Sequence, residues 1–193
     1  MKGKQIMPIK IYVDMGHNPT GPNAGAEGNG YTEHQITYDI GRRLAALLNA
    51  NPEFEARTSH NSPTQILGTS NSTSLSTRVN DANSWGANYY ISLHTNASTN
   101  ATASGVEGYA YNRTSQGYVL GEYILTALSA ATGLDNRGMF VRPSLYVLRR
   151  TRMPSVLIEM GYISNRGDAV LMGTEPDVFA RGIYNGILAY FGM

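Results

Sequence analysis

Residues 9–17, IKIYVDMGH, decide the fold of this chain. A short apolar run rich in β-branched residues is typical of a strand covered on both faces, so we predict a buried strand over residues 9–14. The run is followed by Gly16 and His17. Because ligands of open α/β sheets bind at the carboxyl ends of the strands, His17 lies where chemistry is expected.

Two later segments repeat this pattern. Residues 89–94, YYISLH, form an apolar run that again ends in a histidine, and residues 155–160, SVLIEM, form an apolar run that carries Glu159. Between the predicted strands the apolar residues have helical spacing, which predicts helices over residues 32–47, 75–85, 118–131 and 177–190. This alternation predicts an α/β fold: a single domain over residues 1–193, with a mostly parallel or mixed central sheet and helices on both faces.

The remaining segments have weaker signals. We predict strands over residues 54–58, 106–111 and 146–149, and a loop over residues 59–76, which are rich in Ser, Thr and Asn. No internal repeat and no linker between domains is visible in the sequence.

The composition excludes several classes of protein. The 193 residues carry a formal net charge of +1, and we interpret the tightest basic cluster, Arg149, Arg150 and Arg152, as a solvated loop rather than a nucleic-acid site. The chain has no cysteine, so disulfides, cysteine ligands and cysteine nucleophiles are excluded. No apolar run approaches the roughly 18 residues of a membrane span, and no apolar signal-peptide stretch precedes the first strand. We therefore expect no nucleic-acid partner and no membrane span.

Four side chains carry the candidate chemistry: His17, Glu33, His94 and Glu159. Two imidazoles and one carboxylate are a known ligand set for catalytic zinc, with a fourth position left for water. A further carboxylate is needed to move protons. Glu159 is the candidate, because a buried unpaired charge is costly and a buried strand therefore has little other reason to carry a glutamate. Each residue alone also has a structural interpretation: a hydrogen-bonded histidine, a glutamate that favours the helix dipole, or a glutamate paired with an arginine.

Other polar residues compete for these roles. Glu27 is the rival of Glu33, which we prefer because the start of a helix fixes a ligand more rigidly than a glycine-flanked loop. We interpret His34 as a surface residue or a support for a ligand, and His60 as a solvated loop residue. Asn96 either orients a ligand, contacts substrate or caps a loop.

The candidate residues stand in motifs that run in order through nearly the whole chain. These motifs are D-x-G-H at 14–17, G-A at 25–26 followed by Glu33, L-x-x-R-x-x-x-A-N at 75–83, S-x-H-x-N-A at 92–97, N-R-G at 136–138, and V-L-x-E-x-G-Y-x-S-N at 156–165. As an ordered set they resemble the zinc-dependent N-acetylmuramoyl-L-alanine amidases of the amidase 3 type.

The resemblance implies that zinc is bound by His17, Glu33 and His94 and that Glu159 is the catalytic carboxylate. It implies hydrolysis of the amide bond between N-acetylmuramic acid and L-alanine in bacterial peptidoglycan, for lysis or remodelling of the cell wall outside the cytoplasm. We expect a monomer, encoded by a bacterium or, given that no signal peptide is visible, by a phage. The N-R-G segment is expected to form a turn in which Arg137 is either structural or binds a substrate carboxylate.

Some features depart from the family pattern. Residues 18–20, NPT, replace a glycine-rich run, and the usual T-R order is reversed at Arg57 and Thr58. No segment is long enough for the regulatory helix that blocks the site in some members, so we expect an open site. Two other functions stay open: a zinc peptidase, and a wall-binding module without turnover, which is disfavoured because such a module needs no glutamate on a buried strand.

Overall fold

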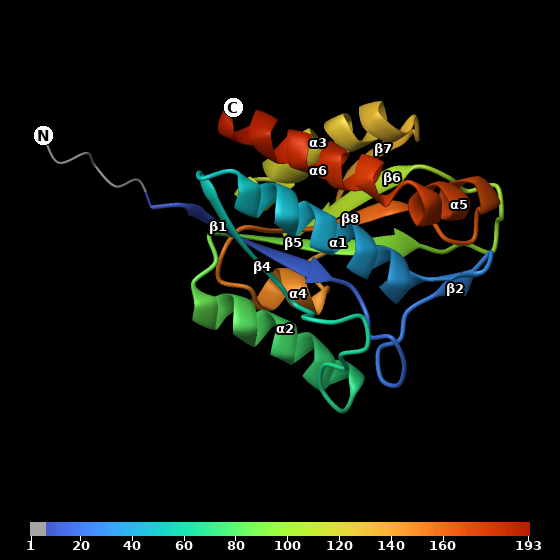
Figure 1. The fold of residues 1–193 in the computed structure, drawn as a ribbon, viewed down its shortest axis with the longest axis horizontal. Coiled ribbons are helices and arrows are strands. Elements are labelled where there is room, and N and C mark those ends of the chain that lie inside the picture. Colours follow the sequence, from blue (N-terminus) through green and yellow to red (C-terminus); the bar gives the residue numbers. More distant parts are fainter. Residues whose placement is uncertain (1–6) are drawn as a thin grey trace, which may run out of the picture.

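A six-stranded sheet forms the centre of the computed structural model, which describes residues 7–193 (Figure 1). The prediction that no signal peptide is present rests partly on residues 1–6, which lie outside the described residues. The strand order is β4-β1-β5-β8-β6-β7. The bounds are β1 (Ile9–Met15), β4 (Phe54–Thr58), β5 (Tyr89–Asn96), β6 (Val106–Ala110), β7 (Asn136–Val141) and β8 (Ser155–Tyr162), and the short strands β2 (Glu27–Gly28) and β3 (Tyr31–Thr32) pair with each other.

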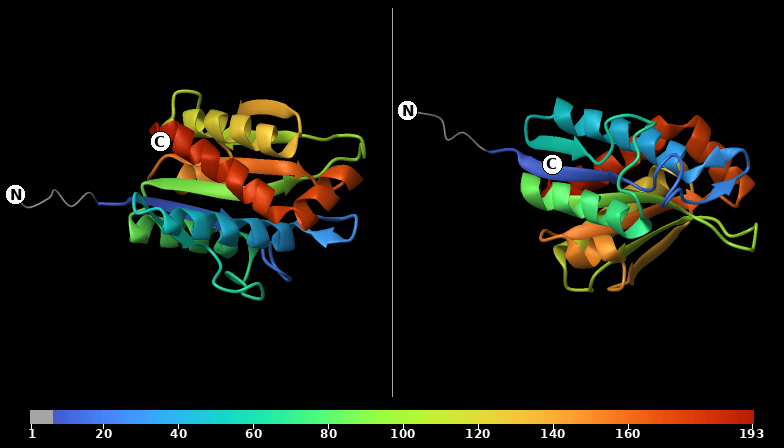
Figure 2. Two further views of the ribbon diagram at one scale, coloured as in Figure 1. Left: turned by 45° about the horizontal axis from the view of Figure 1, so that its top comes forward. Right: turned by 90° about the horizontal axis from the view of Figure 1, so that it is seen from below.

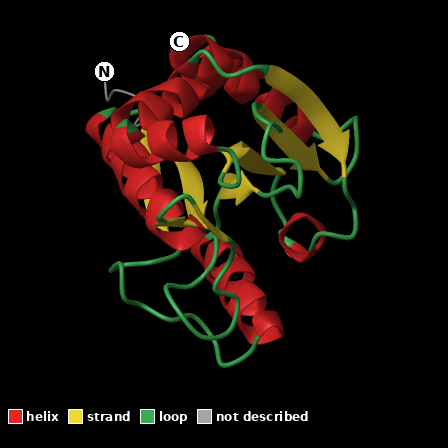
Figure 3. Ribbon diagram, turned by 90° about the vertical axis from the view of Figure 1, so that its right-hand side faces the viewer, coloured by secondary structure: helices red, strands yellow, loops and turns green. Residues whose placement is uncertain are grey.

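The sheet is mixed. Strands β4, β1, β5 and β8 are parallel, whereas β6 runs antiparallel to β8 and β7 is parallel to β6. The carboxyl ends of β1, β5 and β8 therefore meet at one edge. Figure 3 views the molecule from this end, where long loops gather.

Helices cover both faces of the sheet, which confirms the predicted fold class (Figures 1 and 2). The helices are α1 (Glu33–Ala50), α2 (Asn71–Trp85), α3 (Gln116–Thr132), α4 (Tyr146–Arg150), α5 (Arg166–Thr174) and α6 (Pro176–Phe191). Helices α1, α3 and α6 pack over the larger apolar core, and α2 and α4 enclose a smaller core on the opposite face. Within residues 7–193 no helix is both long and apolar enough to cross a membrane.

Residues 71–76 form the first turns of α2, so the prediction of a loop there is wrong. The Ser70 hydroxyl accepts a hydrogen bond from the Thr73 N–H, and the Thr73 hydroxyl accepts one from the Ser70 N–H. This reciprocal cap starts the helix within a polar sequence that otherwise resembles a loop. Helix α5 has no counterpart among the predicted elements.

Two predictions between β6 and β8 are also wrong. Residues 146–149, predicted as a strand, form helix α4, because Val147 and Leu148 are buried against the smaller core and packing overrides their strand propensity. The N-R-G segment is the start of β7 rather than a turn. The register shifts there, so that Val106 pairs with Asn136 and Glu107 with Gly138. Arg137 is therefore the extra residue of a bulge.

Candidate active site

His17 follows β1 and has a φ of 69°, a left-handed conformation that few residues other than glycine adopt. Its Nδ1 lies 3.2 Å from the carbonyl oxygen of Asn23, and its Nε2 lies 3.2 Å from Oε2 of Glu33. When Nδ1 carries a proton, it can donate to this carbonyl oxygen, and Nε2 can then bind either Glu33 through its own proton or, without that proton, a metal ion. This is the usual arrangement of a metal-binding histidine.

Glu33 is the first residue of α1, where Thr32 caps the helix. Its side chain is buried, and backbone N–H groups fix both carboxylate oxygens: Ala26 donates to Oε2 at 3.0 Å and Thr95 donates to Oε1 at 2.9 Å. Burial raises the pKa of Glu33, but hydrogen bonds from His17 and His94 outweigh it and hold the pKa well below its usual range. The carboxylate is therefore charged and held in one orientation.

His94 lies near the end of β5 and completes a group with His17 and Glu33. Its Nδ1 lies 3.0 Å from Oε1 of Glu33, and its ring packs edge-on against that of His17 with the centroids 4.8 Å apart. The three potential ligand atoms all lie within 4.8 Å of one another. Glu27 is exposed on β2 and stands outside this group, so the structure brings together the preferred carboxylate and not its rival.

The surroundings of this group fit a metal ion. Two nitrogens and a carboxylate are the donor set of catalytic zinc sites with one open position, and the two histidine side chains remain about one-fifth exposed, at 21% and 19%. Glycines make room for both rings. A Cβ on Gly16 would lie 2.6 Å from the His94 ring, and a Cβ on Gly25 would lie 2.6 Å from the His17 ring.

Glu159 lies in β8, in register with His94 of β5 and with Glu107 of β6, so the three side chains form a row on one face of the sheet. Its Oε2 is buried without a hydrogen-bond partner. Within residues 7–193 it makes no ion pair, which disfavours the structural alternative of a Glu159–arginine pair. Burial, together with the charges of Glu33 and Glu107, raises the pKa of Glu159 well above its usual value. Such a carboxylate holds a proton more strongly than an exposed glutamate does, which suits a group that moves protons.

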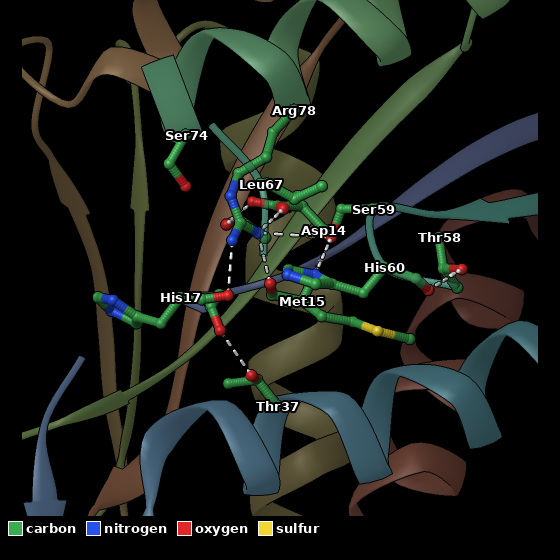
Figure 4. Close-up of polar contacts among 12 residues, drawn as sticks. Asp14, Met15, His17, Thr37, Thr58, Ser59, His60, Leu67, Ser74 and Arg78 are labelled. Carbon is green, nitrogen blue, oxygen red and sulfur yellow. Dashed lines mark hydrogen bonds and ion pairs between the residues drawn. The ribbon is translucent and has the colours of Figure 1, made fainter. Parts of the chain in front are cut away.

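Arg78 of α2 holds the chain immediately around His17 (Figure 4). Its guanidinium group is buried, donates to Asp14 at 2.7 Å, and also donates to the carbonyl oxygens of Met15 at 2.5 Å and His17 at 2.6 Å. The Thr37 hydroxyl donates to the carbonyl oxygen between them, that of Gly16, at 2.8 Å. Three successive carbonyl groups are thus fixed from α1 and α2, which maintains the unusual backbone at His17.

The other two histidines are buried behind this segment. His34 is buried and contacts the carbonyl oxygens of His17 and Pro63, at 3.3 and 3.0 Å, so the surface alternative is wrong and its role as a support for a ligand stays a prediction. His60 was predicted to be solvated, and this is wrong: its ring packs against His34 and contacts Asn18 and Ser59. Burial lowers the pKa of His60 to about 3, so its ring is neutral.

Asn96 and Arg137 both bind Glu107. The Asn96 amide donates to Oε1 of Glu107 at 2.8 Å, and its own oxygen accepts the N–H of Ala97, as a loop cap does. The Arg137 Nε donates to Oε2 of Glu107 at 2.9 Å. The sequence did not predict a role for Glu107.

A small hollow opens beside the histidine pair. It is lined by His17 and His94 and by apolar side chains from α2, the start of α4 and β8; these are Leu75, Leu145, Tyr146, Val147 and Leu157. The group is therefore accessible to a substrate with an apolar portion.

Comparison with known proteins gives a consistent result. A family model described as N-acetylmuramoyl-L-alanine amidase matches residues 11–189. The amidase LytC of Bacillus subtilis is 34% identical, with 94% of this chain and 35% of LytC covered, and the amidase CwlM of Bacillus licheniformis is 32% identical, with 96% and 70% covered. The chain thus spans about a third of the length of LytC.

The fold is also shared with solved structures. The crystal structure of an N-acetylmuramoyl-L-alanine amidase from Clostridium difficile 630 superposes with a TM-score of 0.85 at 27% identity, with 96% of this chain and 97% of that chain covered. As the ordered motifs predict, the chain belongs to the N-acetylmuramoyl-L-alanine amidase family.

Proposed function

We propose that residues 1–193 are the catalytic domain of a zinc-dependent N-acetylmuramoyl-L-alanine amidase, which hydrolyses the amide bond between N-acetylmuramic acid and L-alanine in bacterial peptidoglycan. The observation that carries this proposal is the group of His17, Glu33 and His94, whose potential ligand atoms lie within 4.8 Å of one another. Because the substrate is a wall polymer, the site of action is outside the cytoplasm. The domain acts as a monomer.

Zinc would be held by His17 through Nε2, by His94 through Nδ1 and by the Glu33 carboxylate. When bound, zinc supplies a Lewis acid that polarises the amide carbonyl and lowers the pKa of a water molecule towards neutrality. Glu159 accepts the proton of the attacking water at its carboxylate and returns it to the leaving nitrogen of L-alanine.

The products of wall digestion test the reaction. Purified peptidoglycan incubated with the chain is expected to release intact stem peptides that begin with L-alanine and to leave uncut glycan strands, as read by mass spectrometry. A chelator is expected to abolish release, and added zinc to restore it. Stem peptides that lack L-alanine or are cut internally would instead show a zinc peptidase, and binding to the wall without release would show a binding module.

Glu33→Gln is expected to weaken zinc binding by more than about 100-fold, because changes outside the ligand shell alone cost about 10–100-fold in affinity. The matched control is Glu27→Gln, which removes the same charge from an exposed position six residues earlier. Affinity is measured by competition with a chromogenic chelator. Equal loss in both variants, or a larger loss in Glu27→Gln, would contradict the proposed ligand set.

A further inference from the structure

The face of the sheet that carries His94 and Glu159 continues onto β6. Glu107 of β6 is in register with Glu159, and Tyr109, two residues along, is in register with Leu157 of β8. Leu157 lines the hollow beside His17 and His94. The side chain of Tyr109 therefore borders the same surface, one strand beyond the proposed catalytic carboxylate.

Glu107 anchors this part of the surface. Its carboxylate is buried and accepts hydrogen bonds from four side chains: Asn96 at 2.8 Å, Arg137 at 2.9 Å, Tyr162 at 3.3 Å and Tyr109. Arg137 compensates its charge. The Tyr109 ring is thus fixed by its hydroxyl, while the charge of Arg137 is already paired with Glu107.

Arg142 is in a different situation. It follows β7, where its backbone N–H donates to the carbonyl oxygen of Ala110 at 3.0 Å, and its guanidinium group lies over the Tyr109 ring, 4.8 Å from the centroid. The residue is exposed, and within residues 7–193 no carboxylate pairs with it. The positive charge of Arg142 lowers the pKa of Glu159, although burial raises it by more.

Arg142 lies close enough to the proposed catalytic residues to contact a bound substrate. Leu145, three residues after Arg142, lines the hollow beside the histidines. Neighbouring strands lie about 4.8 Å apart and residues about 3.3 Å apart along a strand, so a group over Tyr109 is on the order of 10 Å from Glu159. Two extended peptide residues span about 7 Å. A group on the second residue of a bound stem peptide therefore falls within reach of Arg142.

We propose that the Arg142 guanidinium group, held on the Tyr109 ring, binds the carboxylate of the second residue of the stem peptide. A planar guanidinium matches a carboxylate with two parallel hydrogen bonds, and stacking on an aromatic ring pre-orders it. This inference rests on the proposed function. A stem peptide whose second residue carries a free α-carboxylate should then be cleaved in preference to one in which this group is amidated.

Two soluble substrates test the proposal: N-acetylmuramoyl-L-alanyl-D-glutamine, the acid, whose α-carboxylate is free, and its α-amide. In both substrates the γ-carboxyl group is blocked as an amide, so they differ only in the α-carboxylate. The wild-type chain is expected to cleave the acid with a kcat/KM about tenfold higher, a typical effect of one charge-assisted pair at an exposed site. Arg142→Ala should raise KM for the acid about tenfold, leave the amide unchanged and barely alter kcat. Arg142→Lys should retain part of the selectivity.

Arg113→Ala is the matched control. Arg113 is also exposed and also lies over a tyrosine ring, at 6.0 Å, but that ring belongs to Tyr118 in helix α3 and not to the sheet face that carries Glu107 and Glu159. This variant should keep the wild-type ratio between the two substrates. Equal kcat/KM for both substrates in the wild-type chain, or an equal loss on both in Arg142→Ala, would overturn the inference.

A binding measurement separates this inference from the proposed function. Calorimetric titration of the zinc-loaded chain with L-alanyl-D-glutamine and with its α-amide should show tighter binding of the acid, and Arg142→Ala should remove the difference. Cleavage of both substrates without selectivity would count against the carboxylate site alone. If neither substrate is cleaved, the amidase proposal fails, and the titration still decides whether Arg142 binds a carboxylate.

Discussion

Replacing Glu159 with glutamine is expected to lower kcat about 10³-fold while zinc remains bound at wild-type stoichiometry. General acid–base catalysis by a positioned side chain contributes about 10²- to 10⁴-fold, and the amide of glutamine cannot accept or return the proton. The substitution keeps the size of the side chain and removes a carboxylate oxygen that is buried without a partner. The fold should therefore be stable or slightly stabilised.

Glu107→Gln is the comparison that isolates this effect. Glu107 and Glu159 are paired residues of neighbouring strands, but Glu107 accepts hydrogen bonds from four side chains, whereas Glu159 accepts none from the side chains of residues 7–193. We expect Glu107→Gln to lower Tm with a much smaller loss of kcat. Single-turnover rates, metal analysis and thermal melts of both variants measure these quantities. Full activity of Glu159→Gln with zinc bound would refute the proposed proton transfer.

The candidate residues of the site were predictable where the neighbouring sequence alone indicates the element on which each residue lies. His17, His94 and Glu159 follow or interrupt apolar strands, and the topology of α/β sheets brings such strand ends to one edge. Glu33 was preferred over Glu27 because it begins a helix, and in the structure the end of that helix lies against both histidines. The metal-binding role of the group stays a prediction.

The surroundings of the site were not predictable in the same way. His60 stands in a polar segment that resembles a solvated loop, yet it is buried because His34, Asn18 and Ser59 come to it from other parts of the chain. The role of Glu107 likewise depends on donors that lie up to 55 residues away. The hydrogen-bond partners of His60 and Glu107 come together only in the folded chain, so the spacing of residues along the sequence does not predict them.

The errors in the fold have a related cause. The start of α2 has loop-like composition and depends on one pair of hydrogen bonds between Ser70 and Thr73. Helix α4 contains residues that favour strands in other contexts. Their helical conformation depends on burial of Val147 and Leu148 in the smaller core beneath α2. Long segments with strong periodicity, such as α1 and α6, were predicted to within a few residues because their own apolar faces determine them.

Replacing Arg78 with methionine is expected to lower the free energy of unfolding by about 3–5 kcal/mol, because the change leaves Asp14 charged, buried and without its partner. Burial raises the pKa of Asp14, but the Arg78 charge and the Ser92 hydroxyl outweigh it, so that the pKa lies well below its usual range. Urea unfolding at neutral pH measures the loss. The exposed pair of Arg57 and Asp81 is the control, and Arg57→Met should cost at most about 1 kcal/mol.

A double variant separates the charge of Arg78 from its contacts with the backbone. Arg78→Met combined with Asp14→Asn removes the uncompensated charge, so it should regain much of the lost stability. The carbonyl oxygens of Met15 and His17 still lack their donor in this variant. If Arg78 orients His17 for zinc, both the single and the double variant should bind zinc about 10- to 100-fold more weakly, the usual effect of losing a group that orients a ligand. Restored stability accompanied by restored zinc affinity would instead show that Arg78 acts only by neutralising Asp14, and that the unusual backbone at His17 is maintained by Thr37 and the rest of the loop.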